Sequence, residues 1–494
     1  MITAKRERKM SNAIEGLKPE LVWKHFAAIS RIPRCSKNEA AVGQYVLDAA
    51  KRLRLVAKRD KSGNVVVKKP ATPGKENVRS VALQGHLDMV CEKNADKTHD
   101  FSKDPIELIR KDNVLMADRT TLGADNGIAV ATNLAVMESS DMEHGPLELL
   151  FTVDEETGLT GAGSLGPDFL ESRTLLNLDS EDEGELYVGC AGGRNTTGIW
   201  TVDFEKAPPK SEMVIVGVKG LQGGHSGVEI DKGRGNSIKI LNRVLLALGE
   251  KGARVSAISG GNKSNAIPRE AEAVLYLPKK KLAEARELIR NYSEMVRAEL
   301  AAVEPDLAIT MTEPSSLRKG KVIPNNLQKK ICRALSAMPH GVIKMSAEIS
   351  WLVETSTNLA VVRTEKKQIV VTTSQRSSVA SELDEICQSV GSGFELGKAQ
   401  VETTDGYPGW KPNLDSLVLK VAKDTYRSLF GKEPEVKAVH AGLECGIIGE
   451  RFPGMDMVSF GPTLRGVHSP DERIYIDTVE RFWTFLVGIL RNVN

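Results

Sequence analysis

The first third of the chain alternates apolar runs of strand length with segments that have helical periodicity. Residues 36–53 place apolar side chains on one helical face, and residues 123–140 predict a helix that starts near Asn126. Ser36 and Glu39 have the spacing of a helix-capping box. Strands that alternate with helices predict an α/β sheet that is at least partly parallel and covered by helices on both faces. The apolar runs are NVVVKK (64–69), SVALQGHLD (80–88), LELLFTVDEE (147–156) and TLLNLDSED (174–182).

The pattern changes near residue 195. Longer strands, such as MVIVGVKG (213–220), are then followed by long amphipathic helices. We therefore expect an inserted α+β domain of residues 193–391 within a discontinuous α/β domain formed by residues 1–192 and 392–494. A ββαβ-like order occurs twice in the insert, so it could consist of two subdomains. GSGFELG (391–397) is the expected return linker.

Several apolar segments of the first part lead into side chains that bind metals. A single acid at a strand end is usually solvated, but four such positions in succession, two of them beside glycines, favour a shared site. Ligands of open α/β sheets bind outside the carboxyl ends of the strands, so we expect these side chains to converge there. They are His86, Asp88, Asp125, Glu155, Glu156 and Asp179.

Carboxylate oxygens and imidazole nitrogens are ligands of zinc and manganese. Two ions about 3.5–4 Å apart need a shared carboxylate, and Asp125, in a glycine-rich turn at a helix start, is the best candidate. His86 and Asp88 lie two residues apart in an extended segment, so Asp88 can orient the imidazole. Glu155 and Glu156 point in different directions, so one can bind metal while the other faces a metal-bound water as a general base.

Composition narrows the classes of partner. The net charge is +2, with basic and acidic residues well mixed, which argues against nucleic acid or an anionic membrane as a partner. No apolar run reaches the roughly 18–20 residues of a membrane span, and the basic start of the chain lacks the apolar region of a secretory signal. The six scattered cysteines include no CxxC pair, so we expect reduced thiols and a cytoplasmic protein.

The chain resembles the M20 family of metallopeptidases in HLD (86–88), GADNG (123–127), DEETG (154–158), the acid of LDSED and the late histidine of GVHSPDE. Longer stretches are similar to the cytosolic dipeptidases of the aminoacyl-histidine dipeptidase type within that family. These stretches are GHLDMVCEKN, LLFTVDEETGLTGA, GYPGW, HAGLECG and GVHSPDE. The resemblance runs from about residue 12 to the end and is most specific over residues 82–193 and 405–475.

This resemblance implies a metal-dependent exopeptidase of the dizinc type that cleaves unblocked dipeptides with broad specificity, including Xaa-His. It also implies two divalent ions per subunit, Zn²⁺ first and Mn²⁺ or Co²⁺ as alternatives, and a homodimer. One ion would be held by His86, Asp125 and Asp179, and the other by Asp125, Glu156 and His468. Glu155 would be the general base, and Asp88 would orient His86. Val467 departs from the family, where a proline is expected.

The insert would correspond to the lid domain of the family, with hinges near residues 192 and 391. His225, in GGHSG, would reach the substrate and help to stabilise the oxyanion, although a lone histidine in a turn is more often structural. The resemblance leaves open whether it acts in its own subunit or across a dimer. Weaker substrate-binding candidates are Asn265, Arg376, His440 and Glu444; Arg376 could grip a substrate carboxylate.

Three alternatives remain open at this point. An aminotripeptidase or an aminoacylase of the same fold would use the same metals. A catalytically inactive binding protein is disfavoured because the ligand set and Glu155 are intact. A hydrolase without metal is disfavoured because no GxSxG motif is present.

Overall fold

The computed structural model describes residues 13–314 and 320–494, which divide into two compact units. Unit 1 comprises the chain up to Gly189 together with Pro412–Ala438 and Leu443–Asn494, and unit 2 comprises Cys190–Lys411 and Val439–Gly442. The expected insert therefore lies inside unit 2. Unit 2 continues beyond it because β21 (Gln400–Thr403) pairs with β9 (Gly192–Thr201).

Unit 1 is built on a mixed sheet of order β1-β2-β6-β3-β7-β23-β8-β22. β3 is parallel to β6 and β7, and β7 is parallel to β23, so the carboxyl ends of these four strands share one edge of the sheet. β3, β6 and β7 are buried at every position, as expected for strands covered on both faces. The strands are β1 (Val56–Arg59), β2 (Val65–Lys69), β3 (Val81–His86), β6 (Leu147–Thr152), β7 (Thr174–Asn177), β8 (Glu185–Cys190), β22 (Glu435–Val439) and β23 (Asp456–Ser459).

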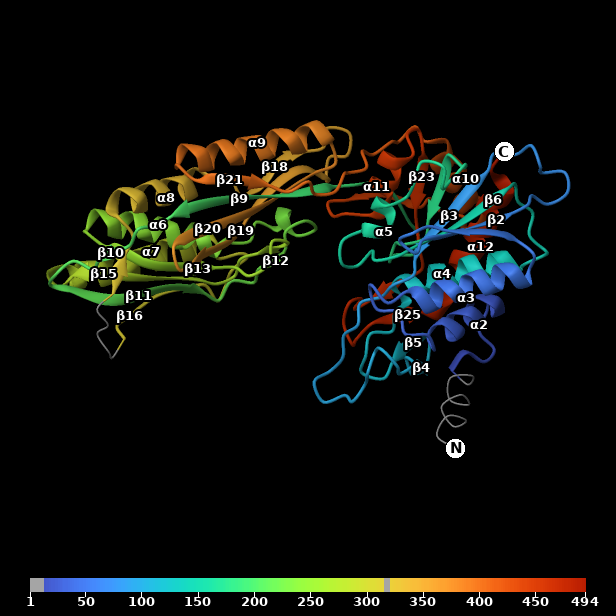
Figure 1. Cartoon of the computed structure of the whole chain (residues 1–494), viewed down its shortest axis with the longest axis horizontal. Helices are drawn as coiled ribbons and strands as arrows, with labels where there is room; N and C mark the ends of the chain where they lie inside the picture. The colour runs from blue at the N-terminus through green and yellow to red at the C-terminus, as the bar shows by residue number, and fades with distance from the viewer. Residues whose placement is uncertain (1–12, 315–319) are drawn as a thin grey trace. The chain divides into compact units, whose positions relative to one another are not determined.

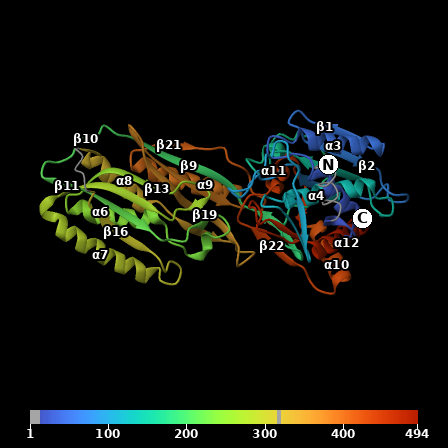
Figure 2. The same cartoon turned by 90° about the horizontal axis from the view of Figure 1, so that it is seen from below.

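Helices cover this sheet, and a smaller sheet of order β24-β25-β5-β4 completes unit 1 (Figure 1). α4 packs on β3, α2 packs on α4, and α10 lies beside α12 (Figure 2). The helices are α2 (Glu20–Ile29), α3 (Ala40–Arg52), α4 (Ala124–Glu138), α5 (Thr160–Gly163), α10 (Leu417–Phe430), α11 (Glu444–Arg451) and α12 (Ile476–Asn492). The small strands are β4 (Leu108–Lys111), β5 (Val114–Ala117), β24 (Leu464–Arg465) and β25 (Arg473–Tyr475).

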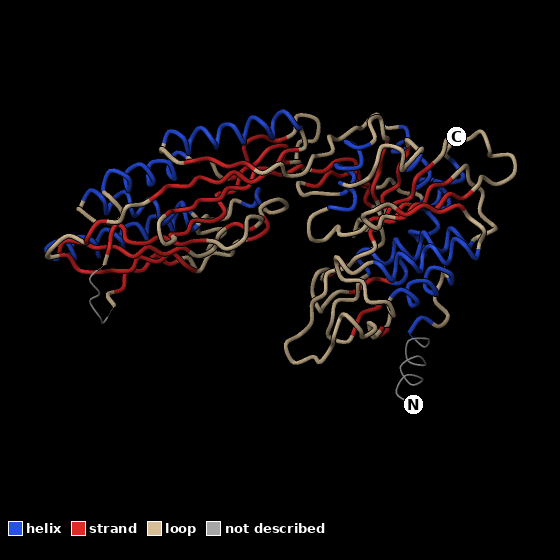
Figure 3. The backbone as a smooth tube through the Cα atoms, viewed as in Figure 1, coloured by secondary structure: helices blue, strands red, loops and turns tan. Residues whose placement is uncertain are grey.

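Unit 2 is built on an antiparallel sheet of order β16-β11-β15-β13-β19-β20-β9-β21, with β18 paired to β19. Four long helices run beside the strands, and one hydrophobic cluster includes residues of the sheet and of all four helices (Figure 3). The helices are α6 (Ser237–Glu250), α7 (Leu282–Glu299), α8 (Asn325–Ala337) and α9 (Ala380–Leu396). The remaining strands are β11 (Ser211–Lys219), β13 (Arg254–Gly260), β15 (Ala271–Pro278), β16 (Ala308–Thr312), β18 (Gly341–Met345), β19 (Val353–Thr364) and β20 (Gln368–Ser377).

Short elements complete unit 2. The strand pairs are β10 (Glu205–Lys206) with β17 (Lys321–Val322) and β12 (Gly224–His225) with β14 (Ala266–Ile267). Two 3₁₀ turns, η1 (Ile230–Lys232) and η2 (Lys279–Lys281), precede α6 and α7. Strands β16-β11-β15-β13 continue into β19-β20-β9-β21 where β13 pairs with β19, so unit 2 has one continuous sheet.

Three local predictions are wrong. GSGFELG (391–397) is no linker, because α9 runs through Leu396 and buries Phe394 against Trp200. Ser36 does not cap a helix, because α3 starts only at Ala40 and the Ser36 hydroxyl instead donates to Asp88 Oδ2. The expectation of reduced thiols is wrong for Cys35 and Cys91. A short β-bridge between Cys35 and Met89 places these two cysteines side by side.

Cys35 and Cys91 form a disulfide with their Cα atoms 5.7 Å apart. Cys190, Cys332, Cys387 and Cys445 are buried thiols.

The predicted fold class, a mixed α/β sheet flanked by helices with an inserted α+β part, is confirmed. Within residues 13–314 and 320–494, no helix has both the length and the apolar character needed to cross a membrane.

Candidate functional site

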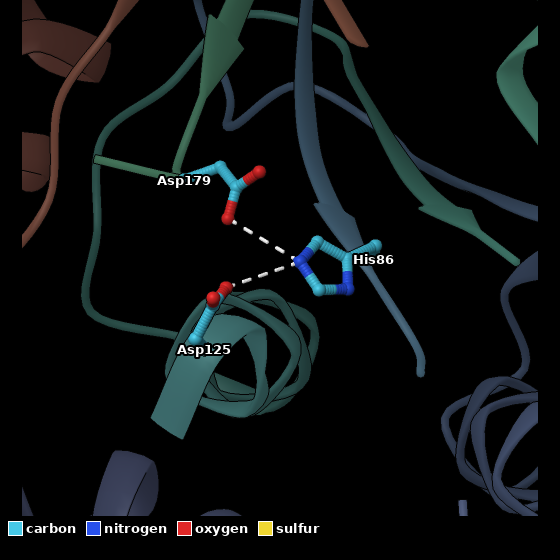
Figure 4. Close-up of side chains that lie close together, drawn as sticks. All are labelled: His86, Asp125 and Asp179. Atoms are coloured by element: carbon cyan, nitrogen blue, oxygen red, sulfur yellow. Dashed lines mark hydrogen bonds and ion pairs between the residues drawn. The ribbon is translucent and has the colours of Figure 1, made fainter. Parts of the chain in front are cut away.

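Three side chains from three segments of unit 1 meet at the shared edge of the parallel strands (Figure 4). His86 is the last residue of β3, Asp125 lies in the first turn of α4, and Asp179 follows β7. The Nε2 atom of His86 lies 3.2 Å from Asp125 Oδ1 and 3.5 Å from Asp179 Oδ1. All three side chains are nearly or fully removed from solvent. We call these residues set A.

A second group shares Asp125. The Nε2 atom of His468 lies 3.0 Å from Asp125 Oδ2 and 2.9 Å from Glu156 Oε2. The two oxygens of Asp125 thus face two different histidines, His86 and His468. We call Asp125, Glu156 and His468 set B.

The donor atoms of both sets fit divalent cations. Zinc bound tetrahedrally at about 2.0–2.2 Å holds its ligand atoms about 3.3–3.6 Å apart. The two separations from His86 in set A, 3.2 and 3.5 Å, are close to this spacing, and those from His468 in set B, 3.0 and 2.9 Å, are shorter. Glu156 Oε1 is buried without a hydrogen-bond partner, which is costly unless a cation pairs with it. A carboxylate that presents one oxygen to each set is also the bridge that a pair of ions about 3.5–4 Å apart requires.

Asp88 is held from several sides. Its Oδ1 lies 3.3 Å from His86 Nδ1, the ring nitrogen that faces away from Asp125. It also accepts hydrogen bonds from the Ser36 hydroxyl and the backbone amides of Glu155 and Glu156. Burial alone would raise the pKa of Asp88, but the interactions with His86, Ser36 and Glu155 lower it to about 2. Asp88 is therefore ionised beside the ring of His86.

Glu155 lies close to set A, and its surroundings favour the protonated form of its carboxyl group over the charged form. Burial and the charges of Asp179, Glu444 and Glu156 raise the pKa of Glu155 well above its ordinary value, against the opposing effect of His86. A carboxylate with a raised pKa is a stronger proton acceptor than an ordinary glutamate.

Glu444 is the first residue of α11 and is fully buried in unit 1. Its Oε2 accepts hydrogen bonds from Gln84 Nε2 at 2.5 Å and Thr152 Oγ1 at 2.7 Å, whereas Oε1 is buried without a hydrogen-bond partner. Burial raises the pKa of Glu444 to about 8. The sequence indicated Glu444 only through its glycine-rich surroundings.

Sequence reasoning missed three charged residues around the two sets: Arg34, Glu181 and Glu472. Burial and the charges of Asp125 and Asp179 raise the pKa of Glu181 to about 7. Glu472 is buried and binds the backbone that carries Asp125. Its position in GVHSPDE, four residues after His468, was the signal that could have revealed it.

The candidate residues of unit 2 are each held by their own neighbours. His225 Nδ1 accepts hydrogen bonds from the backbone amides of Gly227 and Val228, both at 3.2 Å. This nitrogen is therefore unprotonated, and Nε2 carries the hydrogen of the neutral ring. Burial, reinforced by the charge of Arg376, lowers the pKa of His225 to about 4. His225 is thus a neutral hydrogen-bond donor.

Arg376 is a buried cation of unit 2. Its Nη1 donates to the Tyr407 hydroxyl at 2.8 Å, and its Nε is buried without a hydrogen-bond partner. Among the described residues, no carboxylate oxygen lies within ion-pair distance of it. A buried guanidinium with donors to spare is suited to bind an anion.

The two other candidates of unit 2 differ in their surroundings. His440 is 5% exposed, and its Nε2 lies 2.7 Å from the Ser356 hydroxyl. Burial and the charge of Arg376 lower its pKa to about 3. Asn265 accepts a backbone hydrogen bond from Ser226 and lines, with His225, a cavity of about 1030 Å³ on the sheet of unit 2.

The sequence profile described as peptidase family M20/M25/M40 matches residues 82–492. The chain belongs to this family, and the family resemblance inferred from its motifs is confirmed.

Among curated proteins, the chain is similar to the cytosol non-specific dipeptidase of Escherichia coli (strain K12). The two are 40% identical over 97% of this chain and 98% of the relative. Among solved structures, the aminoacylhistidine dipeptidase from Vibrio alginolyticus matches with a TM-score of 0.90 and 42% identity, over 97% of this chain and 98% of that one. The aminopeptidase PepT from Bacillus cereus, at 17% identity and a TM-score of 0.57 over 97% and 99% of the chains, shares the fold.

Proposed function

We propose that this chain is a metal-dependent dipeptidase that hydrolyses unblocked dipeptides with broad specificity, including Xaa-His. The observation that carries the proposal is the carboxylate of Asp125, whose two oxygens lie 3.2 and 3.0 Å from Nε2 of His86 and His468. The names of two relatives that match nearly the whole chain, a cytosol non-specific dipeptidase and an aminoacylhistidine dipeptidase, support the substrate class.

In this proposal, set A and set B would each hold one divalent ion, with Zn²⁺ as the first choice and Mn²⁺ or Co²⁺ as alternatives. Bound ions of this kind polarise the peptide carbonyl and lower the pKa of water. Asp125 belongs to both sets and would be the ligand that the two ions have in common. The Asp88 carboxylate lies 3.3 Å from Nδ1 on the far side of the His86 ring, and this negative charge would fix the ring orientation and make Nε2 a better ligand.

Glu155 is the proposed general base. It takes a proton from the attacking water and then delivers it to the leaving amine, so that the peptide bond breaks into an acid and an amine. The raised pKa of Glu155 supports both steps, because the group must accept a proton and give it up at the same pH.

Unit 2 supplies the proposed groups for the negative charges of the reaction. His225 donates a hydrogen bond through Nε2–H to the oxyanion that forms as water attacks. Because its ring is neutral, it would stabilise the oxyanion as a hydrogen-bond donor without giving up its proton. Arg376 binds the substrate carboxylate through its free donors. Asn265, His440 and Glu444 are proposed as further substrate contacts.

The cytoplasmic location is also a proposal, which the name of the Escherichia coli relative supports. The homodimer expected from the family resemblance remains a prediction. An aminotripeptidase or aminoacylase activity is the alternative within the same fold, and the likeness to PepT bears on the fold alone.

A panel of substrates tests the function. The protein is assayed on an Xaa-His dipeptide, a second dipeptide, a tripeptide and an N-acyl amino acid, first as purified, then after chelation, and then after addition of Zn²⁺, Mn²⁺ or Co²⁺. We expect cleavage of both dipeptides that chelation abolishes and metal restores. Preferential cleavage of the tripeptide or the N-acyl amino acid would favour the alternatives, and metal binding without any hydrolysis would favour an inactive binding protein.

A further inference from the structure

Glu472 lies 2% exposed at the start of α4 and accepts hydrogen bonds from four successive backbone amides. Its Oε2 accepts from Leu122 and Gly123 at 2.7 and 2.9 Å, and its Oε1 accepts from Ala124 and Asp125 at 2.7 and 3.2 Å. These amides belong to the turn that presents the Asp125 carboxylate. A carboxylate at this position also interacts favourably with the N-terminal dipole of the helix.

Arg34 binds the same turn from another segment. Its guanidinium is buried and donates to the carbonyls of Leu87 at 3.0 Å and Asp88 at 2.9 Å, and also to the carbonyl of Gly123. It thus links the end of β3, which carries His86, to the turn that carries Asp125.

The glycines of GADNG leave room for this guanidinium. A Cβ atom on Gly123 or on Gly127 would overlap with Nη2 of Arg34, and Gly123 also has a φ of 69°, in the left-handed region. The glycines beside Asp125 therefore have a steric reason that does not involve the metal. Because these glycines lack a Cβ atom, the Arg34 guanidinium can reach the backbone of the turn that carries Asp125.

We propose that Arg34 and Glu472 are positioning residues for the metal ligands. Together they fix the relative positions of the three segments that carry His86, Asp125 and His468. Arg34 joins the segment of His86 to the turn of Asp125, and Glu472 joins that turn to the loop of His468. The inference rests on the proposed function, because it presumes that set A and set B bind ions. It assigns no contact with substrate to either residue.

The two ions are predicted to respond unequally. Glu472 is bonded to the turn of Asp125 and lies on the loop of His468, so it supports two of the three residues of set B. In set A it supports only Asp125. Loss of Glu472 therefore weakens the ion of set B more than the ion of set A.

The test is a stepwise Zn²⁺ titration of chelated, full-length protein in competition with a chromophoric chelator. The variants are Glu472→Ala and Glu472→Gln. The glutamine variant keeps the size of the side chain, but its NH₂ group would face two of the four amides and cannot accept their hydrogen bonds. If the alanine variant does not fold, the glutamine variant alone is titrated. We expect wild type to bind two ions, and both variants to lose Zn²⁺ affinity at least about tenfold at one of the two sites and less at the other.

Glu148 provides the matched control. It is a buried acid of unit 1, 4% exposed, that accepts backbone hydrogen bonds from Glu171 and Ser172 away from the cluster. Glu148→Ala should leave both Zn²⁺ affinities within about twofold of wild type. Equal affinities in Glu472→Gln and wild type, or an equal loss in Glu148→Ala, would overturn the proposal.

Arg34→Lys tests the other half, because lysine keeps the charge but cannot reach three carbonyls in a planar fork. Its control is Arg173→Lys, since Arg173 also donates to three carbonyls in unit 1. We expect at least a tenfold loss of Zn²⁺ affinity in Arg34→Lys alone. If wild type itself bound no Zn²⁺, the proposed function would fail, whereas two tight ions in every variant would refute only the positioning role.

Discussion

Unit 1 and unit 2 hold their candidate functional side chains in opposite ways. In unit 1, the histidine of each set lies within about 3.5 Å of the two acids of that set, and Asp125 is shared between the two histidines. In unit 2, each candidate is bound separately by its own neighbours: His225 by backbone amides, Arg376 by Tyr407 and His440 by Ser356.

This difference follows from charge. Unit 1 gathers acids that repel one another, so the arrangement is favourable only when cations balance them. Unit 2 buries a guanidinium and neutral imidazoles, which are suited to negative charge. The comparison shows that the acids and histidines of unit 1 suit cations, whereas the buried guanidinium and neutral imidazoles of unit 2 suit anions.

The largest expected effect is at the proposed base of unit 1. Glu155→Gln should lower kcat by roughly 10²–10⁴-fold, because the amide cannot accept the proton from water. Both ions should remain bound, since Glu155 belongs to neither set. Turnover is measured together with metal content, and the exposed acid Glu171, changed to Gln, is the control. Substantial residual kcat would remove Glu155 from the role of base.

The next effect tests the donor of unit 2. His225→Ala should lower kcat by about 10²–10³-fold, because an oxyanion donor acts mainly in the transition state. Metal content should not change, since the ions belong to unit 1. His340→Gln, at a histidine of unit 2 outside the candidate set, serves as control. Unaltered kinetics in His225→Ala would make this histidine structural.

A smaller effect is expected at the buried cation of unit 2. Arg376→Met should raise KM for a dipeptide about 10–100-fold, because a hydrogen bond to a charged group contributes about 1.5–3 kcal/mol. The same dipeptide with a C-terminal amide should be affected much less. The exposed Arg363, changed to Met, is the control. Equal losses on both substrates would exclude a carboxylate-binding role for Arg376.

The smallest effect concerns acid stability. Burial and the charge of Arg376 lower the pKa of His440 to about 3, whereas an unfolded histidine titrates near 6.5. Between these values the unfolded chain binds a proton that the folded chain does not. The stability contribution is therefore full above about pH 6.5 and is lost as the pH falls towards 3, by at most about 1.4 kcal/mol per pH unit.

Hydrogen exchange of the unit 2 strands from pH 7 to pH 4, in the presence of chelator, measures this slope. The His440→Asn variant should show a shallower slope than wild type. An identical slope would mean that other groups account for the acid sensitivity of unit 2, and that His440 is not the neutral buried residue inferred here.

Sequence patterns anticipated the parts of unit 1 that depend on local chemistry. The alternation of strands and helices predicted the partly parallel sheet, and the acids and histidines that end apolar runs predicted the edge where the side chains meet. Three features escaped prediction. Arg34 and Glu472 interact with the backbone over long sequence separations, Cys35 and Cys91 meet only because their segments pair, and residues 391–397 follow the hydrophobic surface offered by Trp200 rather than their own glycines.

The sequence by itself determined the family, the fold class and the types of ligand atom, because motif spacing and hydrophobic periodicity are properties of neighbouring residues. Only the tertiary structure decided which oxygen of Asp125 faces which histidine, and which buried charges lack partners. Such features depend on distances of a few ångströms between segments that lie up to several hundred residues apart, and no local pattern encodes those distances.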